Sequence, residues 1–256
     1  MQSGMTTKPQ VEAGLQAQLE LARQVQLSLL PERRCCLSNW EVAFSYEPAG
    51  FVSGDYVDLI PFGDDEFYFA LGDVSGKGVA ASILMSHLHA TFRALLPSRQ
   101  TIEEVLAVAS RMFCQSTLPS QFATLVLGKA DHSGNLELVN AGHTPVIIVE
   151  EKTIRLISGT SLPLGMFCAT EFVAVRRSVS PGTTLLLYSD GITESTDDAG
   201  TAFDLTRVAE RAVPWNILSL SEVLDAIRRS IIDYTNGAQP SDDRTMLALR
   251  WSPKGL

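Results

Sequence analysis

Four aspartates border apolar, strand-like segments of this sequence. Asp55 lies in "SGDYVD", Asp73 in "LGDVSGKG" and Asp190 in "LLLYSDGITE", each where an apolar strand is expected to end, and Asp243 in "SDDRTMLAL" precedes a strand. Hard cations such as Mg²⁺ and Mn²⁺ prefer oxygen ligands, and clustered carboxylates are stable when a cation offsets their repulsion. If these strand ends meet at one cleft, the four side chains would form a metal site.

Each aspartate alone also has an ordinary structural interpretation. Asp-Gly favours hairpin turns, and an aspartate before a strand or helix often caps it. The set is more informative than its members, because neighbouring glycines let the backbone approach a ligand closely. These glycines are Gly54, Gly72, Gly76 and Gly191.

The segment 69–82, "FALGDVSGKGVAAS", invites comparison with a phosphate-binding loop. A Walker A loop has four residues between its first Gly and the Gly-Lys pair, and Ser or Thr after the Lys. Here three residues separate Gly72 from Gly76-Lys77, and Gly78 follows. The spacing argues against a nucleotide-binding loop and directs attention to Asp73.

Composition indicates one main domain. The chain has 256 residues, 45% of them hydrophobic, which is enough for a full core. Its net charge of −9 argues against nucleic acid or an anionic membrane as a partner. No stretch has the pattern of a signal peptide or the roughly eighteen apolar residues of a spanning helix.

The cysteines indicate a reducing compartment. The four are Cys35, Cys36, Cys114 and Cys168, with one adjacent pair and no Cys-x-x-Cys. This spacing argues against a disulfide framework and a zinc knuckle. We therefore expect a cytoplasmic protein.

A helix is expected near the N-terminus. Residues 1–12 are polar and are expected to be disordered, whereas residues 14–30 repeat apolar side chains at helical spacing until Pro31 ends the pattern. The apolar positions are Leu15, Leu19, Ala22, Val25 and Leu29. This stripe could dock on the domain or pair with a second copy as a short coiled coil.

After Trp40 the pattern changes to short segments of period two, which predict strands. The segments are 41–48, 66–74, 122–130, 135–142, 144–150, 152–158, 171–177, 183–190 and 244–251. Turns at 131–135 and 150–152 predict hairpins, and helices are expected at 78–96, at 101–117 after a Thr101–Glu104 capping box, and at 221–235. Because βαβ alternation is absent, we expect an α+β sandwich.

Several of these motifs together resemble one family. They are "EPAGFVSGDYVDL", "FALGDVSGKGVAAS", "FATLVLG", "LELVNAGHTPVIIV", "LPLGM", "LLLYSDGITES" and "SDDRTMLAL". In this order they resemble the metal-dependent protein phosphatases of type 2C, in the bacterial SpoIIE/RsbU-like branch. The resemblance covers roughly residues 20–251, and "LARQVQLSLLP" is similar to the helix that leads into that catalytic domain.

The resemblance implies a fold, a site and a reaction. The fold is a four-layer αββα sandwich of two antiparallel sheets. Asp73 would bridge two Mn²⁺ or Mg²⁺ ions with the Val74 carbonyl as a further ligand, Asp55 would hold one ion, and Asp190 and Asp243 the other. The implied reaction is hydrolysis of phosphoserine or phosphothreonine on a protein, without a covalent intermediate.

The sequence departs from the branch at two positions and leaves other residues open. Ser53 replaces the first Gly of the usual Gly-Gly-Asp-Tyr motif, and Val57 replaces a second Tyr. His143 could serve as a general acid, although a structural loop histidine is the more common case. Lys77 could help a phosphate approach or decorate a helix N-terminus. Three neighbouring acidic residues are expected to be solvated: Asp58, Asp242 and Glu194.

By resemblance, the substrate would be a phosphorylated anti-anti-sigma-type protein with a STAS domain, in a bacterial partner-switching pathway. Residues 1–37 would form a polar tail and a regulatory or dimerisation helix, and residues 38–252 the phosphatase domain. The alternative is a catalytically silent module of the same fold that binds a partner protein. Retention of all four aspartates argues against that alternative.

Overall fold

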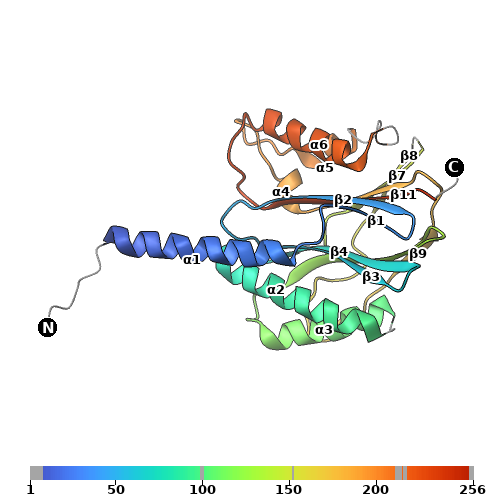
Figure 1. The fold of residues 1–256 in the computed structure, drawn as a ribbon, viewed down its shortest axis with the longest axis horizontal. Helices are drawn as coiled ribbons and strands as arrows, with labels where there is room; N and C mark the ends of the chain where they lie inside the picture. Colours follow the sequence, from blue (N-terminus) through green and yellow to red (C-terminus); the bar gives the residue numbers. More distant parts are fainter. Residues whose placement is uncertain (1–7, 99–100, 152, 211–214, 216–217, 254–256) are drawn as a thin grey trace.

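Two antiparallel sheets are stacked face to face at the centre of the computed structural model, which describes residues 8–98, 101–151, 153–210, 215 and 218–253 (Figure 1). The first sheet has the strand order β1-β2-β11-β10-β7-β8. Its strands are β1 (Arg34–Leu37), β2 (Trp40–Glu47), β7 (Val146–Glu150), β8 (Thr153–Ile157), β10 (Thr184–Tyr188) and β11 (Arg244–Trp251). The second sheet has the order β3-β4-β5-β6-β9. Its strands are β3 (Asp55–Phe62), β4 (Glu66–Val74), β5 (Ala123–Asp131), β6 (Asn135–Ala141) and β9 (Val175–Ser178).

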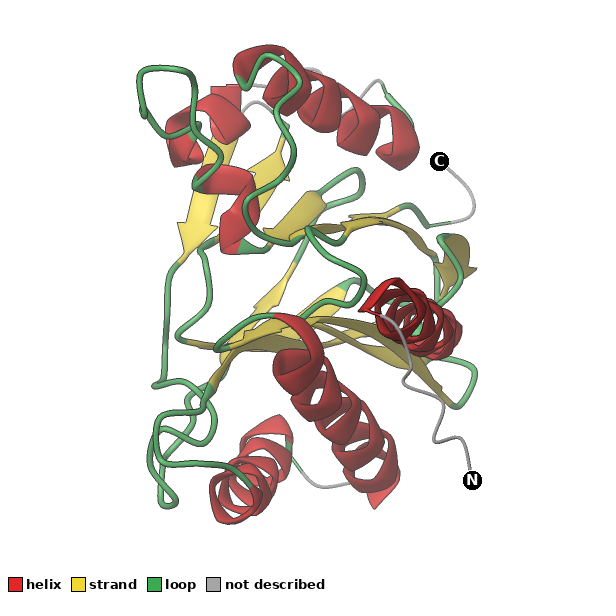
Figure 2. Ribbon diagram, turned by 90° about the vertical axis from the view of Figure 1, so that its left-hand side faces the viewer, coloured by secondary structure: helices red, strands yellow, loops and turns green. Residues whose placement is uncertain are grey.

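Helices cover the outer face of each sheet. Helices α2 (Gly78–Leu95) and α3 (Ile102–Ser116), with the short η1 (Leu96–Ser98), lie on the second sheet, and α4 (Asp190–Thr193), α5 (Asp204–Glu210) and α6 (Leu220–Tyr234) lie on the first. Figure 2 shows the two strand layers between the two helical layers. The expected α+β sandwich with αββα layers is confirmed.

Strand β4 shows how the sequence builds three of these layers. Its residues alternate between the two faces of the sheet. Phe67, Phe69 and Leu71 belong to the core between the sheets, whereas Tyr68 and Ala70 belong to the core beneath α2 and α3. A third apolar cluster lies between the first sheet and α6. Because both faces of β4 are buried, its run of apolar residues is nearly continuous.

Helix α1 (Lys8–Leu29) extends away from the sheets in its first half (Figure 1). The helix expected over residues 14–30 is confirmed, but it begins at Lys8. Disorder was therefore the wrong expectation for residues 8–12, while residues 1–7 lie outside the described part of the chain. Near its C-terminal end, Leu27 packs against the core between the sheets.

Strands β1 and β3 were not predicted from the sequence, because neither shows a clear period-two alternation of apolar residues. Asp55, Asp58 and Pro61 interrupt the apolar residues of β3. Pro61 is compatible with a strand here because β3 lies at the edge of its sheet. Asp55 is the first residue of β3, which corrects the expectation that it follows a strand.

Asp58 is fully buried in an ion pair, which corrects its expected solvation. Its carboxylate accepts hydrogen bonds from Arg93 Nε at 3.0 Å and from an Arg93 terminal nitrogen at 2.7 Å. The Leu59 amide and the Tyr56 hydroxyl donate to the same carboxylate. Because a buried charge is costly unless paired and hydrogen-bonded, this contact fastens α2 to β3.

A disulfide joins Cys114 of α3 to Cys168, in the segment between β8 and β9, with 5.3 Å between their Cα atoms. The expectation that the cysteines form no disulfide is wrong at this pair, so the cysteine pattern no longer indicates a reducing compartment. Fifty-four positions separate the two cysteines, so their spacing in the sequence gave no indication of the contact. Cys35 and Cys36 are free thiols.

One helical stretch, Gly78–Ser98, is long and apolar enough to cross a membrane by length and composition, contrary to the expectation that no such run exists. The structure explains its apolarity without a membrane. Met85, Leu88 and Phe92 of this stretch are buried in the core on the outer face of the second sheet.

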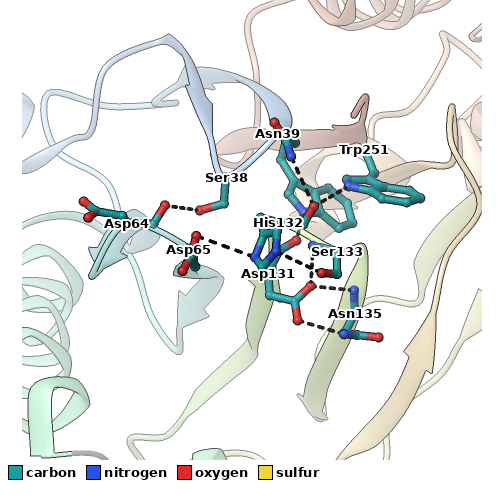
Figure 3. A network of polar contacts seen from close by, with 10 residues as sticks. Ser38, Asn39, Asp64, Asp65, Asp131, His132, Ser133, Asn135 and Trp251 are labelled. Atoms are coloured by element: carbon teal, nitrogen blue, oxygen red, sulfur yellow. Dashed lines mark hydrogen bonds and ion pairs between the residues drawn. The ribbon is translucent and has the colours of Figure 1, made fainter. Parts of the chain in front are cut away.

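The hairpin expected at residues 131–135 is confirmed between β5 and β6 (Figure 3). The Asp131 carboxylate accepts hydrogen bonds from the Ser133 and Asn135 amides. The Asn39 side chain donates to the His132 carbonyl at 3.2 Å, which links this turn to the first sheet. The turn lies at the end of the sheets remote from Asp73, since Asp131 pairs with Glu66 and Thr124 with Asp73. The second expected hairpin joins β7 to β8, although Lys152 lies outside the described residues.

His143 is a buried anchor of the loop between β6 and β7. Its Nδ1 lies 2.8 Å from the Thr124 hydroxyl, and its amide donates to the Asn140 side chain at 2.8 Å. Burial lowers the pKa of His143 to about 4, and the Tyr188 backbone carbonyl opposes this shift only in part. The imidazole is therefore neutral at pH 7, so it is not the protonated acid considered from the sequence.

This buried neutral histidine should make the fold sensitive to acid. Its pKa is about 4 in the folded state and ordinarily 6.5, so between these values the unfolded chain binds the proton first and stability falls as pH falls. Relative to His143→Gln, the wild-type protein should lose about 2 kcal/mol of unfolding free energy between pH 7 and pH 5. Urea unfolding at the two pH values measures this difference.

His132→Gln, at the exposed hairpin turn, is the matched control and should follow the wild type. The carboxylates near Asp73 are common to all three proteins, so their titration cancels in the comparison. An equal loss in the wild type and in His143→Gln would contradict the assignment of a buried neutral imidazole.

Candidate metal centre

The structure brings the four predicted aspartates to one end of the seam between the sheets. Asp55 and Asp73 are direct register partners on β3 and β4 of the second sheet. Asp190 begins α4 shortly after β10, and Asp243 directly precedes β11, both in the layer of the first sheet. Each sheet therefore contributes two carboxylates to the same region.

Asp55 is the most buried of the four, at 1% exposure. Its Oδ2 accepts hydrogen bonds from the Ser189 hydroxyl at 2.9 Å and the Thr245 hydroxyl at 2.5 Å, and both donors come from the first sheet's side of the seam. Burial raises the pKa of Asp55 well above its ordinary value, and the neighbouring Asp73 raises it further. The two hydroxyls offset this only in part.

Asp73 lies among other carboxylates. Burial raises the pKa of Asp73 to about 7, and Asp190, Asp242 and Asp243 add to the shift. The Lys77 ammonium lowers the pKa of Asp73, but its effect is smaller than that of burial or of any of these carboxylates. Protein groups alone therefore leave the negative charge around Asp73 largely uncompensated.

Asp190 shares this environment from the other side of the seam. Burial raises the pKa of Asp190, and Glu194 and Asp242 contribute further. Glu194 is exposed, in agreement with its expected solvation. Gly191 lets α4 approach closely, since a Cβ at this position would lie 2.2 Å from the Asp243 carbonyl oxygen.

Asp243 is held by the loop that precedes β3. Its Oδ1 accepts a hydrogen bond from the Ala49 amide at 2.8 Å, and its Oδ2 accepts one from the Gly54 amide at 3.0 Å. The Ser189 hydroxyl also lies 3.0 Å from the Asp243 carbonyl. These contacts join the first sheet's aspartate to the strand that begins with Asp55.

Val74 and Lys77 follow Asp73 in the chain. Val74 is fully buried, and its amide donates to the Gly54 carbonyl at 3.4 Å. Lys77 Nζ lies 2.7 Å from the Asp242 carboxylate and donates to the Ser241 carbonyl at 2.9 Å. Asp242 is thus paired, which differs from simple solvation, and Lys77 links the start of α2 to the loop before β11.

Ser189, Thr245 and Gln26 contact the site or its loop but were not identified from the sequence. Ser189 directly precedes Asp190 in the chain and Thr245 lies two positions after Asp243, which was the only signal available. Gln26 lies 27 positions before Ser53, whose backbone it contacts, so no local pattern could indicate it.

The donor set fits a hard divalent cation. The carboxylates offer only oxygen ligands. Burial, and after it the neighbouring carboxylates, raise the pKa values of Asp55, Asp73 and Asp190, and a cation would offset both effects. Among the described residues, no three His, Cys, Asp or Glu side chains are close enough to define a metal site by themselves. The four aspartates therefore lie in one region, and a bound ion would set the final distances between their carboxylates.

Comparison with known proteins gives the family. The family model described as "Stage II sporulation protein E (SpoIIE)" matches residues 63–252. The chain is 30% identical over 261 residues to protein IcfG of Synechocystis sp., covering 91% of this chain and 41% of that protein. It is 26% identical over 195 residues to the phosphoserine phosphatase RsbP of Bacillus subtilis, covering 73% of this chain and 48% of that protein. The chain thus spans less than half the length of these two relatives.

Solved structures share the fold. The RsbU and RsbW domains of Rv1364c from Mycobacterium tuberculosis match with a TM-score of 0.74 and 25% identity, covering 88% of this chain and 62% of that chain. The SiaA-PP2C domain of Pseudomonas aeruginosa matches with a TM-score of 0.82 and 18% identity, covering 94% and 99%. RsbX in complex with magnesium matches with a TM-score of 0.66 and 13% identity, covering 86% and 98%. With the family model covering most of its length, the chain belongs to the SpoIIE family and has the fold of PP2C phosphatase domains.

Proposed function

We propose that this chain is a Mn²⁺- or Mg²⁺-dependent protein phosphatase that hydrolyses phosphoserine or phosphothreonine on a partner protein. The observation that carries the proposal is the convergence of Asp55, Asp73, Asp190 and Asp243 from both sheets in a SpoIIE-family fold. The name of RsbP, a phosphoserine phosphatase, supports the reaction, and the magnesium complex of RsbX supports the cation.

Two divalent cations would be held by the predicted ligands. We assign Asp73 to both ions, the Val74 carbonyl as an added backbone ligand, Asp55 to one ion, and Asp190 and Asp243 to the other. A pair of such ions supplies charge neutralisation, orientation of the phosphoryl oxygens and a water of lowered pKa. A phosphate monoester carries about two negative charges near neutral pH, so without cations these carboxylates would repel it.

Hydroxyl groups and backbone amides of the chain orient the proposed ligands. The hydroxyls of Ser189 and Thr245 both donate to Oδ2 of Asp55, which fixes that carboxylate at the seam. The amides of Ala49 and Gly54 hold both oxygens of Asp243. Cys114 is bonded to Cys168, so it is not a free thiolate nucleophile, and attack by water without a covalent intermediate fits the site.

The proposed substrate is a phosphorylated STAS-domain protein of the anti-anti-sigma type, in a cytoplasmic partner-switching pathway of a bacterium. The support comes from the names of similar proteins. The structure from Mycobacterium tuberculosis contains an RsbU and an RsbW domain in one protein, and the relative from Bacillus subtilis is a phosphoserine phosphatase. Dephosphorylation would change which partner the STAS protein binds.

We also propose that residues 1–37 form an N-terminal unit that regulates the catalytic unit, residues 38–252, through self-association. In α1, the exposed fractions of Leu15, Leu21 and Val25 are 56%, 61% and 57%, which is an apolar surface on an extended helix. Strand β1 pairs with β2, so the two units share the edge of the first sheet.

Phosphatase activity should depend on divalent metal and on the aspartates. Mn²⁺ or Mg²⁺ should support hydrolysis of p-nitrophenyl phosphate and of a phosphoserine STAS protein, and EDTA should abolish both reactions. Asp73→Asn and Asp190→Asn should each lower kcat/KM at least about 100-fold, because each removes charge that holds a cation worth several kcal/mol to the transition state.

Asp65→Asn is the matched control, since Asp65 is an exposed aspartate in the β3–β4 turn, and it should keep wild-type activity. A folded protein without turnover in any metal would contradict the enzyme proposal. It would favour the catalytically silent module that binds a partner protein.

Self-association through α1 should be visible by multi-angle light scattering. The wild type should form a dimer at micromolar concentration, and the double variant Leu21→Glu/Val25→Glu should be monomeric, because both substitutions place charge on an exposed apolar face. Gln16→Glu, exposed on another face of the same helix, serves as the control and should remain dimeric. A monomeric wild type would refute this part of the proposal.

A further inference from the structure

Gln26 of α1 has an environment unlike that of the other polar residues described on this helix. It is buried, with 4% exposure, and it reaches into the body of the protein just before α1 ends. Its partner, Ser53, is fully buried and lies in the loop between β2 and β3. The contact therefore joins the N-terminal helix to the segment that leads into Asp55.

The contact is a two-point hydrogen-bonded pair. Gln26 Nε2 donates to the Ser53 carbonyl at 2.7 Å, and the Ser53 amide donates to Gln26 Oε1 at 2.9 Å. One side-chain amide thus satisfies both backbone polar groups of Ser53. Because the pair is buried, withdrawal of Gln26 would leave a donor and an acceptor without partners, which is costly.

Ser53 and its neighbours in turn position two proposed metal ligands. The Ser53 hydroxyl accepts a hydrogen bond from the Asp55 amide at 3.0 Å. The next residue, Gly54, donates its amide to Oδ2 of Asp243 at 3.0 Å. Ser53 thus stands one residue from a contact to Asp243 and two residues from Asp55 itself.

A cavity of about 390 Å³ lies beside this contact, lined among others by Leu19 of α1, Phe51 and Val52 of the loop, and Asp243. Residues 48–54 belong to no strand or helix, and Gly50 and Phe51 are exposed. Among the described residues, the hydrogen bonds between α1 and this loop are the two made by Gln26.

We propose that Gln26 is a positioning residue for Asp55 and Asp243, so that the affinity of the centre for divalent cations depends on how α1 is seated. The inference rests on the proposed function for its metal readout. It names the contact through which the position of α1 would affect the site, because displacement of α1 would break both hydrogen bonds between Gln26 and Ser53. Residues that orient metal ligands typically change affinity 10–100-fold when altered.

The test compares Gln26→Met, which keeps the length and loses the amide, with Gln24→Met, the same change at an exposed position of α1. Mn²⁺ binding is measured by isothermal titration calorimetry, and amide hydrogen exchange of residues 49–55 is measured without metal. We expect Gln26→Met to bind Mn²⁺ about tenfold more weakly and to lose protection in residues 49–55. Gln24→Met should match the wild type in both measurements, and saturating Mn²⁺ should restore most of kcat in Gln26→Met.

Gln26→Asn covers the case in which Gln26→Met does not fold, because it keeps a neutral amide and shortens the side chain by one methylene. The shorter amide cannot reach both backbone groups of Ser53, so Mn²⁺ affinity and the protection of residues 49–55 should both fall below those of the wild type. Folded Gln26 variants with wild-type affinity and wild-type exchange would overturn the inference.

Failure of the proposed function would look different. In that case the wild type itself would bind no Mn²⁺, or Asp73→Asn would bind it equally well. Hydrogen exchange of residues 49–55 would then decide the positioning role of Gln26 alone. Unchanged protection in Gln26→Met would overturn that role, and lost protection would support it.

Discussion

Repulsion between carboxylates at the seam of the two sheets is the constraint on which the rest of this structure depends. Asp55 and Asp73 oppose each other on adjacent strands, and Asp243 and Asp190 face them from the other sheet. Burial and mutual repulsion raise the pKa of Asp73 to about 7. Clustered carboxylates are stable when a cation offsets their repulsion, which the proposed ions would do. The stacked sheets, their apolar cores and the loops at this end bring the four aspartates together.

The fold meets the constraint by tying the sheets together at both ends of the seam. At the acidic end, Ser189 and Thr245 hold Asp55 across the seam, and the loop before β3 holds Asp243. At the remote end, the β5–β6 turn contacts Asn39 in the turn between β1 and β2 of the first sheet. The Asp58–Arg93 pair secures α2, whose first residues follow Asp73 and Lys77. Each tie is a contact between segments far apart in the sequence.

The sequence indicated the chemistry better than the contacts that support it. Strand β4 and the aspartate near its end were visible from a short apolar run and its neighbouring glycines, and Thr101 and Glu104 marked the start of α3. Strand β3 was missed because Asp58 and Pro61 interrupt its pattern, and only the tertiary pairing with Arg93 makes Asp58 stable there. The Gln26–Ser53 and Cys114–Cys168 contacts were invisible for the same reason, since each depends on the folded arrangement of distant segments.

The central claim is that these aspartates hold divalent cations in place, and a crystal grown with Mn²⁺ tests it most directly. Anomalous diffraction near the manganese absorption edge locates the ions without any assumption about activity. We expect two Mn²⁺ peaks at the seam, about 3.5–4 Å apart, with Asp73 contacting both and Asp55, Asp190 and Asp243 completing their coordination. Absence of peaks at the seam, or Mn²⁺ bound only elsewhere on the molecule, would contradict the account.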